Sequence, residues 1–74
     1  MSDTIKIMDY RMVDILNSDQ LEVGDLIGVG EEVVKIISIE SVRYGFVLIT
    51  ENEFGERESV DAFDDEQFEL FILE

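Results

Sequence analysis

The chain has 74 residues, with 19 Asp or Glu against 5 Lys or Arg, and its formal net charge is −14. A chain of this length forms a single domain, residues 1–74, with a small core. Its charge argues against direct binding of nucleic acid, which requires clustered cations, and against docking on anionic membranes. It contains no Cys and no His, which excludes disulfides, thiolate metal sites and catalysis by histidine.

The composition and the N-terminal residues bear on where the protein works. No apolar run is long enough for a signal peptide or a membrane span, so we expect a cytoplasmic protein. Hydrophobic residues make up 46% of the chain, which is well above the content of charged disordered segments. We therefore expect a folded domain, with a frayed tail at residues 1–3.

Residues 5–16 fit two patterns. Ile5, Met8 and Met12 follow helical spacing, whereas the alternation around Met8 and Met12 is typical of a strand. We favour a strand over residues 10–16, because Tyr, Val and Ile are enriched there and no helix cap precedes it. A helix is the alternative.

The rest of the chain is predicted to form short strands separated by turns. A turn cluster at residues 17–19 leads into a single helical turn at residues 20–21. The further strands are expected at residues 25–29, 33–41, 46–50, 57–62 and 67–73. Glycines near the ends of these runs predict turns or bulges. This spacing predicts an all-β fold, a small antiparallel barrel of about five to six short strands.

Three of these strands carry apolar residues on both faces, whereas a half-buried strand alternates apolar with polar residues. A barrel of about five strands encloses one layer of side chains, so one apolar set must face outward. The predicted partner surface consists of Val34, Ile36, Val47, Ile49, Phe71 and Leu73. Such a surface marks a binding site, and we expect a homo-oligomer or a protein partner. The alternative is that loops and the chain ends cover both faces.

The last third of the chain is strongly acidic. The predicted acidic face comprises Glu51, Glu53, Glu56, Glu58, Asp61, Asp64, Asp65, Glu66 and Glu69. Such a face can dock on a basic partner or imitate the phosphates of nucleic acid. An inhibitor that occupies the groove of a DNA- or RNA-binding enzyme is therefore the alternative function. The simpler interpretation is a solvated face that keeps the protein soluble.

The residues that carry catalytic chemistry are not grouped in any pattern we recognise. No nucleophile accompanies a base, and no pair of acids is placed in an apolar pocket. The acidic run at residues 61–66 lacks the glycine and the alternating ligands of an EF-hand calcium loop. We expect no catalytic residue, no cofactor and no metal site, and hence a non-enzymatic protein that acts by contact with itself or another protein.

Two neighbouring segments carry a family resemblance. Residues 18–29, SDQLEVGDLIGV, followed by residues 32–40, EVVKIISIE, resemble the opening of many small SH3-like barrels. The continuation from residue 45, with its N-E-F-G-E-R turn, is similar to short uncharacterised proteins encoded by bacteriophages. The resemblance implies a fold without an activity, because SH3-like barrels bind peptides, nucleic acids or other subunits. This chain departs from nucleic-acid-binding members in lacking basic loops, and from proline-peptide binders in lacking Trp.

Overall fold

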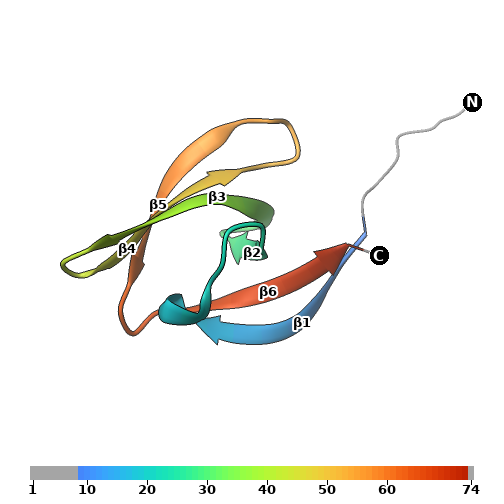
Figure 1. The fold of residues 1–74 in the computed structure, drawn as a ribbon. Helices are drawn as coiled ribbons and strands as arrows, with labels where there is room; N and C mark the ends of the chain where they lie inside the picture. The colour runs from blue at the N-terminus through green and yellow to red at the C-terminus, as the bar shows by residue number, and fades with distance from the viewer. Residues whose placement is uncertain (1–8, 74) are drawn as a thin grey trace, which may run out of the picture.

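The computed structural model describes residues 9–73, which form one antiparallel sheet and a short 3₁₀ turn (Figure 1). The elements are β1 (Tyr10–Asn17), η1 (Ser18–Gln20), β2 (Leu26–Val29), β3 (Glu32–Val42), β4 (Gly45–Glu51), β5 (Arg57–Phe63) and β6 (Gln67–Leu73). The all-β prediction is confirmed, and the segment predicted as strand or helix is a strand from Tyr10 onward. The predicted tail at residues 1–3, and the part of the ambiguous segment before residue 9, lie outside the described residues.

The spatial order of the strands is β1-β6-β2-β3-β4-β5. Strands β2 to β5 follow one another as hairpins, and β6 returns to lie between β1 and β2 (Figure 1). β1 and β5 are therefore the two edges. They do not pair with each other, so the sheet is open and the closed barrel expected from the sequence is not confirmed.

Ser18 ties η1 to the turn between β5 and β6. Its N–H donates to the Glu66 carbonyl oxygen at 3.0 Å, and its hydroxyl donates to the Phe63 carbonyl oxygen at 2.7 Å. Ser18 is only 2% exposed, and a buried polar group is costly unless it is hydrogen-bonded. These bonds hold η1 against the β5–β6 turn, so the two ends of the curled sheet meet through η1 rather than through strand pairing.

The concave face of the sheet holds the core. Its buried residues are Leu21, Ile27, Val34, Ile36, Leu48, Ala62 and Phe68. The partly buried side chains packed against them are Leu16, Val29, Ile39, Phe46 and Val60. All of these except Leu21 belong to strands. The sheet therefore packs against itself, and among the described residues no second layer covers its outer face.

The prediction that Val34 and Ile36 face outward was wrong, because they are 6% and 0% exposed and belong to the core. The reason is a β-bulge in β3, where the pairing with β4 shifts register between Ile36 and Ser38. Ile37 is the extra residue, and the alternation reverses after it, so that Ile39 also packs against the core. A strict period of two would put Ile36 and Ile39 on opposite faces.

Gly45 begins β4 where β3 turns back, close to the edge strand β5. Its φ is +149°, a backbone conformation that L side chains rarely adopt. A Cβ atom at this position would collide with the carbonyl oxygen of Ala62. The glycine therefore lets β4 and β5 approach closely, which the sharp curl of the sheet requires.

Substitution at neighbouring isoleucines tests which face of β3 is buried. We expect Ile36→Ala to lower the free energy of unfolding by about 2–5 kcal/mol, because a fully buried side chain leaves a cavity. Ile37→Ala removes the same atoms from a half-buried position, and we expect it to cost about 1 kcal/mol. Urea unfolding followed by circular dichroism measures both values. An equal or larger loss for Ile37→Ala would contradict the assignment of Ile36 to the core.

Candidate functional site

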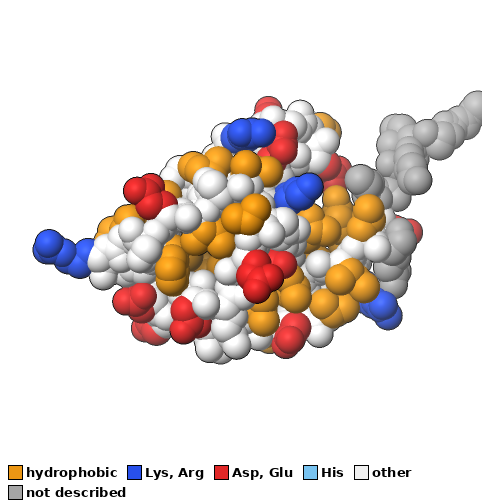
Figure 2. Space-filling model, in the orientation of Figure 1, with side chains coloured by type: hydrophobic (Ala, Val, Ile, Leu, Met, Phe, Trp, Pro, Cys, Tyr) orange, Lys and Arg blue, Asp and Glu red, His pale blue; other side chains and the backbone are white. Residues whose placement is uncertain are grey.

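An apolar surface covers four neighbouring strands on the outer face of the sheet. Residues directly opposite one another in antiparallel strands share a face. Tyr10 lies opposite Leu73, and Phe71 lies opposite both Met12 and Leu26. We define the outer patch as Tyr10, Met12, Leu26, Val33, Phe71 and Leu73. Figure 2 shows hydrophobic side chains exposed near the ends of β1 and β6 and also over β3 and β4, with isolated charged side chains between them.

Gly28 shapes the middle of the outer patch. A Cβ atom there would lie 3.0 Å from Cε1 of Phe71, so the Phe71 ring covers the backbone of β2 at this glycine. The sequence predicted a bulge or bend near Gly28, but β2 pairs with β3 there without a register shift. The glycine instead makes room for an aromatic ring, which explains why Phe71 is half-buried on an otherwise open face.

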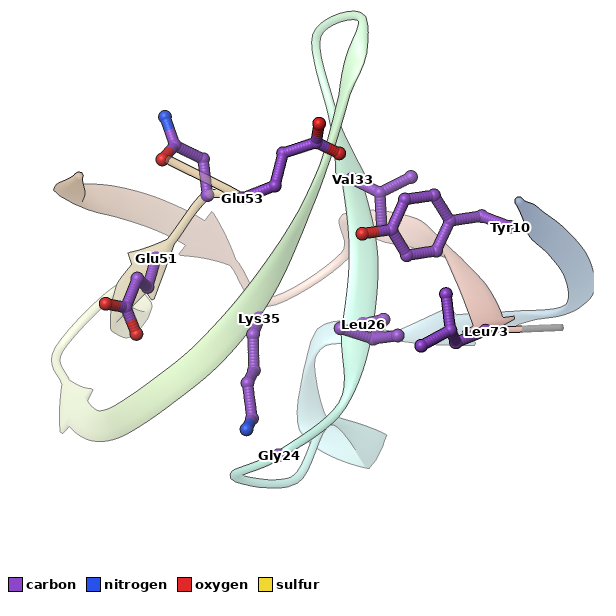
Figure 3. A pocket seen from close by; sticks show the side chains of 9 residues that line it. Tyr10, Gly24, Leu26, Val33, Lys35, Glu51, Glu53 and Leu73 are labelled. Atoms are coloured by element: carbon purple, nitrogen blue, oxygen red, sulfur yellow. The ribbon is translucent and has the colours of Figure 1, made fainter. Parts of the chain in front are cut away.

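A groove of about 410 Å³ lies between the outer patch and the loop that joins β4 to β5 (Figure 3). Its residues are Tyr10, Leu26, Val33 and Leu73 from the patch, Gly24 and Lys35, and Glu51, Asn52 and Glu53 on the side of the loop. Lys35 lies opposite Glu51 in the β3–β4 pairing and is the one cation among these lining residues. The groove therefore has an apolar wall, an acidic wall and a single positive charge between them.

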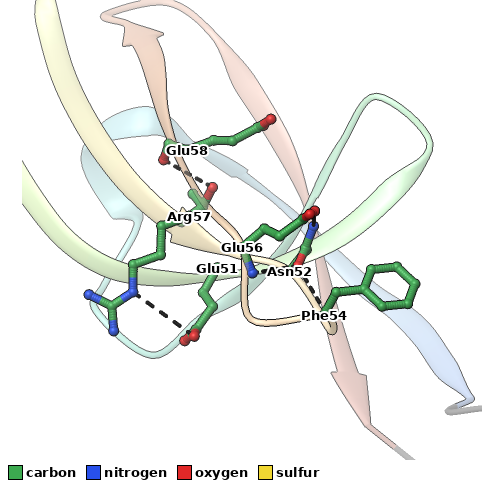
Figure 4. Close-up of polar contacts among 7 residues, drawn as sticks. Glu51, Asn52, Phe54, Glu56, Arg57 and Glu58 are labelled. Atoms are coloured by element: carbon green, nitrogen blue, oxygen red, sulfur yellow. Dashed lines mark hydrogen bonds and ion pairs between the residues drawn. The ribbon is translucent and has the colours of Figure 1, made fainter.

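The β4–β5 loop, residues 52–56, is held in shape by Asn52 (Figure 4). The Asn52 side-chain oxygen accepts the N–H groups of Phe54 and Glu56, each at 2.9 Å, and its amide group donates to the Glu56 carboxylate at 2.9 Å. Backbone bonds from Asn52 N–H to the Glu56 oxygen and from Gly55 N–H to the Asn52 oxygen complete the loop. The Phe54 side chain projects from this ordered loop and is 80% exposed.

The structure separates the residues predicted for the partner surface. Phe71 and Leu73 belong to the outer patch, and Leu73 is 51% exposed. Val47 and Ile49 are half-buried and lie on the outer face of β4, opposite Asp61 and Ser59 of β5 and outside the groove. The remaining two, Val34 and Ile36, belong to the core. The sequence missed the contributions of Tyr10, Met12 and Leu26, because the pairing of β1 and β2 with β6 is not visible in a linear pattern. It missed Val33 because the opposite face of β3, with Val34 and Ile36, was predicted to face outward.

The predicted acidic residues do not form one face. By the same pairing rule, Glu51, Asp61 and Glu69 lie on the outer face, on three different strands, whereas Glu58 lies opposite the buried Thr50. Glu53 and Glu56 lie in the β4–β5 loop, and Asp64, Asp65 and Glu66 at the β5–β6 turn. A second hollow, of about 350 Å³, is lined on several sides by Glu31, Glu32, Glu56 and Glu58. Within residues 9–73, no group of three or more His, Cys, Asp or Glu residues is arranged to hold a metal ion.

The phenol of Tyr44 has a raised pKa. Its hydroxyl donates to the Asp61 carboxylate at 3.2 Å, and its ring centroid lies 5.4 Å from that of Phe63. Loss of hydration, then the hydrogen bond and the negative charge of Asp61, raise the pKa of Tyr44 above its ordinary value of 10.0. The phenol is therefore a neutral hydrogen-bond donor at physiological pH, which suits a contact surface better than acid–base chemistry.

Comparisons with known proteins identified no relative of this chain. No protein-family model, curated protein or solved structure was found to match the chain. Across the part of the chain that the structure describes, no helix is long and apolar enough to cross a membrane.

Removal of the Asn52 side chain tests whether it orders the loop. We expect Asn52→Ala to increase amide hydrogen exchange at Phe54 and Glu56, because both N–H groups lose their acceptor. The free energy of unfolding should fall by roughly 0.5–2 kcal/mol, the usual range for exposed capping bonds. Ser59→Ala, on the exposed part of β5, is the matched control. Unchanged exchange at both amides would show that the loop is ordered by its backbone alone.

Proposed function

We propose that the protein is a non-enzymatic module that acts by protein–protein contact, and that it self-associates through the outer patch. The observation that carries this proposal is the continuous apolar surface on β1, β6, β2 and β3, in which Met12 and Leu73 are 46% and 51% exposed. Contiguous exposed apolar surface of this kind marks interaction sites in soluble proteins. Burial of each such side chain contributes roughly 1.5–3 kcal/mol.

The exposed edge of β1 is less suited to self-association than the outer face of the sheet. The pairing of β1 with β6 shifts register between Met12 and Asp14, so Val13 forms a bulge. The Asp14 carboxylate accepts the N–H of Ile15 at 2.8 Å and competes with any added strand for that donor. Bulges and charged residues are the usual protection of sheet edges against pairing. The association that we propose is therefore packing of faces, and strand addition is not part of it.

We also infer that β2 to β6 form a variant of the SH3-like barrel, in which β1 is an additional edge strand. The support is the return of β6 to β2, which makes the first and last strands of this unit neighbours. A relationship to bacteriophage proteins and a cytoplasmic location stay predictions from the sequence. The alternative function, an acidic inhibitor of a DNA- or RNA-binding enzyme, has less support, because the predicted acidic residues are divided between the strands, the β4–β5 loop and the β5–β6 turn.

Molar mass by light scattering on a size-exclusion column tests self-association. We expect a mass above the 8.5 kDa of one chain, with stronger association at about 500 mM than at about 50 mM salt. Salt favours the contact because each copy carries a net charge of −14, and screening reduces the repulsion between copies. The double variant Met12→Gln with Leu73→Gln should raise the dissociation constant at least about tenfold.

Phe63→Gln is the matched control for this measurement, because Phe63 is also 51% exposed but lies on β5, at the other end of the sheet. It should leave the dissociation constant unchanged. A monomer at both salt concentrations would refute self-association. Self-association that weakens steeply with salt would also contradict the apolar patch, because it would indicate attraction between opposite charges.

A further inference from the structure

The two edges of the sheet, β1 and β5, differ in how their backbones are protected. β1 carries the Val13 bulge and the Asp14 carboxylate, which accepts the N–H of Ile15. β5 pairs with β4 from Arg57 to Phe63 without a shift of register. Bulges, Pro and Lys are common means of protecting an edge from a further strand, and β5 contains none of them.

Hydrogen bonds at the two ends of the β4–β5 hairpin show which backbone groups of β5 face away from β4. In an antiparallel pair, residues bonded to the neighbouring strand alternate with residues whose N–H and C=O groups point away from it. The Asp64 N–H donates to the Tyr44 carbonyl at 3.1 Å, and the Asn52 N–H donates to the Glu56 carbonyl at 2.9 Å. Both bonds assign the odd-numbered residues of β5 to the second class. These residues are Arg57, Ser59, Asp61 and Phe63.

The end of β5 next to the β5–β6 turn is closed to a further strand. The Phe63 N–H donates to the Glu66 carboxylate at 3.1 Å, and the Phe63 carbonyl accepts the Ser18 hydroxyl at 2.7 Å. Within residues 9–73, no side chain is hydrogen-bonded to the outward backbone groups of Ser59 or Asp61, and both residues are exposed. We call the backbone of these two residues the open edge.

The surroundings of the open edge are negative on both faces of the sheet. On the outer face, Asp61 has no ion pair within the part of the chain that the structure describes. On the other face, Glu58 borders the second hollow, whose further acidic residues are Glu31, Glu32 and Glu56. Arg57 is the one cation of β5, and its Nε already lies 4.0 Å from the Glu51 carboxylate (Figure 4).

An aromatic pair lies beside Asp61. The Tyr44 hydroxyl donates to the Asp61 carboxylate at 3.2 Å, and the ring centroids of Tyr44 and Phe63 are 5.4 Å apart. The two aromatic residues are 45% and 51% exposed. Because the phenol is a neutral donor, it leaves the negative charge of Asp61 in place. A cation brought to Asp61 would therefore also meet aromatic ring faces, which attract Lys and Arg.

A further strand would bring its side chains to both negative regions. It would lie about 4.8 Å from β5, with successive side chains on opposite faces. A cation opposite Asp61 would lie on the outer face, and a cation opposite Glu58 would face the second hollow. The β5 strand of a second copy would instead bring the same carboxylates, and like charges on neighbouring strands are destabilising. The open edge is therefore matched to a basic segment and not to a copy of itself.

We propose that the open edge of β5 accepts an extended segment of a partner protein, rich in Lys or Arg, as an additional strand of the sheet. Main-chain hydrogen bonds to Ser59 and Asp61 supply the affinity, as in other cases of strand addition. The carboxylates of Asp61 and Glu58 select basic side chains. This contact is separate from the outer patch, so it does not depend on self-association.

Peptide binding followed by nuclear magnetic resonance tests the proposal. The probe is a blocked octapeptide of alternating Lys and Val, and the control is the same peptide with methylated peptide nitrogens, which keeps the charge and cannot donate. We expect the Lys–Val peptide to shift the amide signals of Ser59 and Asp61 and to slow their hydrogen exchange several-fold. The methylated peptide should bind at least about tenfold more weakly. Equal binding of both peptides, or unchanged signals at the two amides, would overturn strand addition.

Variants of the open edge provide the second measurement. Ser59→Pro removes an N–H that makes no bond within the sheet, so circular dichroism should be unchanged while peptide binding weakens at least about tenfold. Asp61→Asn keeps every backbone group and should weaken binding several-fold at about 50 mM salt. Asp19→Asn, in the exposed part of η1, is its matched control and should have no effect.

The outcomes separate this contact from self-association. Equal losses for Asp61→Asn and Asp19→Asn would overturn the proposal, because binding would then depend on net charge alone. Undiminished binding by a folded Ser59→Pro variant would also overturn it. Light scattering should give the same molar mass for Asp61→Asn as for the unchanged chain. A wild-type chain that is monomeric but binds the Lys–Val peptide at the open edge would refute self-association and support the proposal.

Discussion

The constraint on which this structure depends is that one sheet must enclose its own core. The described chain has no helix and no second sheet to pack against, yet seven hydrophobic residues are buried. A flat sheet cannot bury a face alone, so the strands must curl until residues of β2, β3, β4, β5 and β6 meet. Three features of the fold, at Ile37, Gly45 and Ser18, can be understood from that requirement.

The irregularities occur where the sheet bends or approaches itself. The bulge at Ile37 divides β3, the longest strand, into two parts. Before the bulge the even-numbered residues face the core, and after it the odd-numbered residues do. Gly45 allows β4 to lie against the β5 backbone, and Ser18 joins the two ends of the sheet through η1. Bulges and glycines are the usual means by which a sheet acquires such curvature.

Curling towards one side leaves the other side without cover. The outer face therefore carries apolar residues that a two-layer protein would bury, and Gly28 lets Phe71 lie flat among them. The same face is bordered by Glu51 and Glu53, so apolar attraction and like-charge repulsion act on the same contact. A balance of this kind makes association sensitive to ionic strength, which is why salt dependence separates the possible functions of this surface.

The sequence by itself determined the all-β class, the positions of the strands and the presence of more apolar residues than one small interior can hold. These properties depend on local preference and on composition, which are readable along the chain. It also located the turn at residues 52–57 by its N-E-F-G-E-R pattern, although not the exposure of Phe54. Only the tertiary structure decided which apolar residues face outward, because a bulge adds one residue and reverses the alternation beyond it. Only the tertiary structure placed β6 between β1 and β2, and this long-range pairing created the groove from residues that are far apart in the sequence.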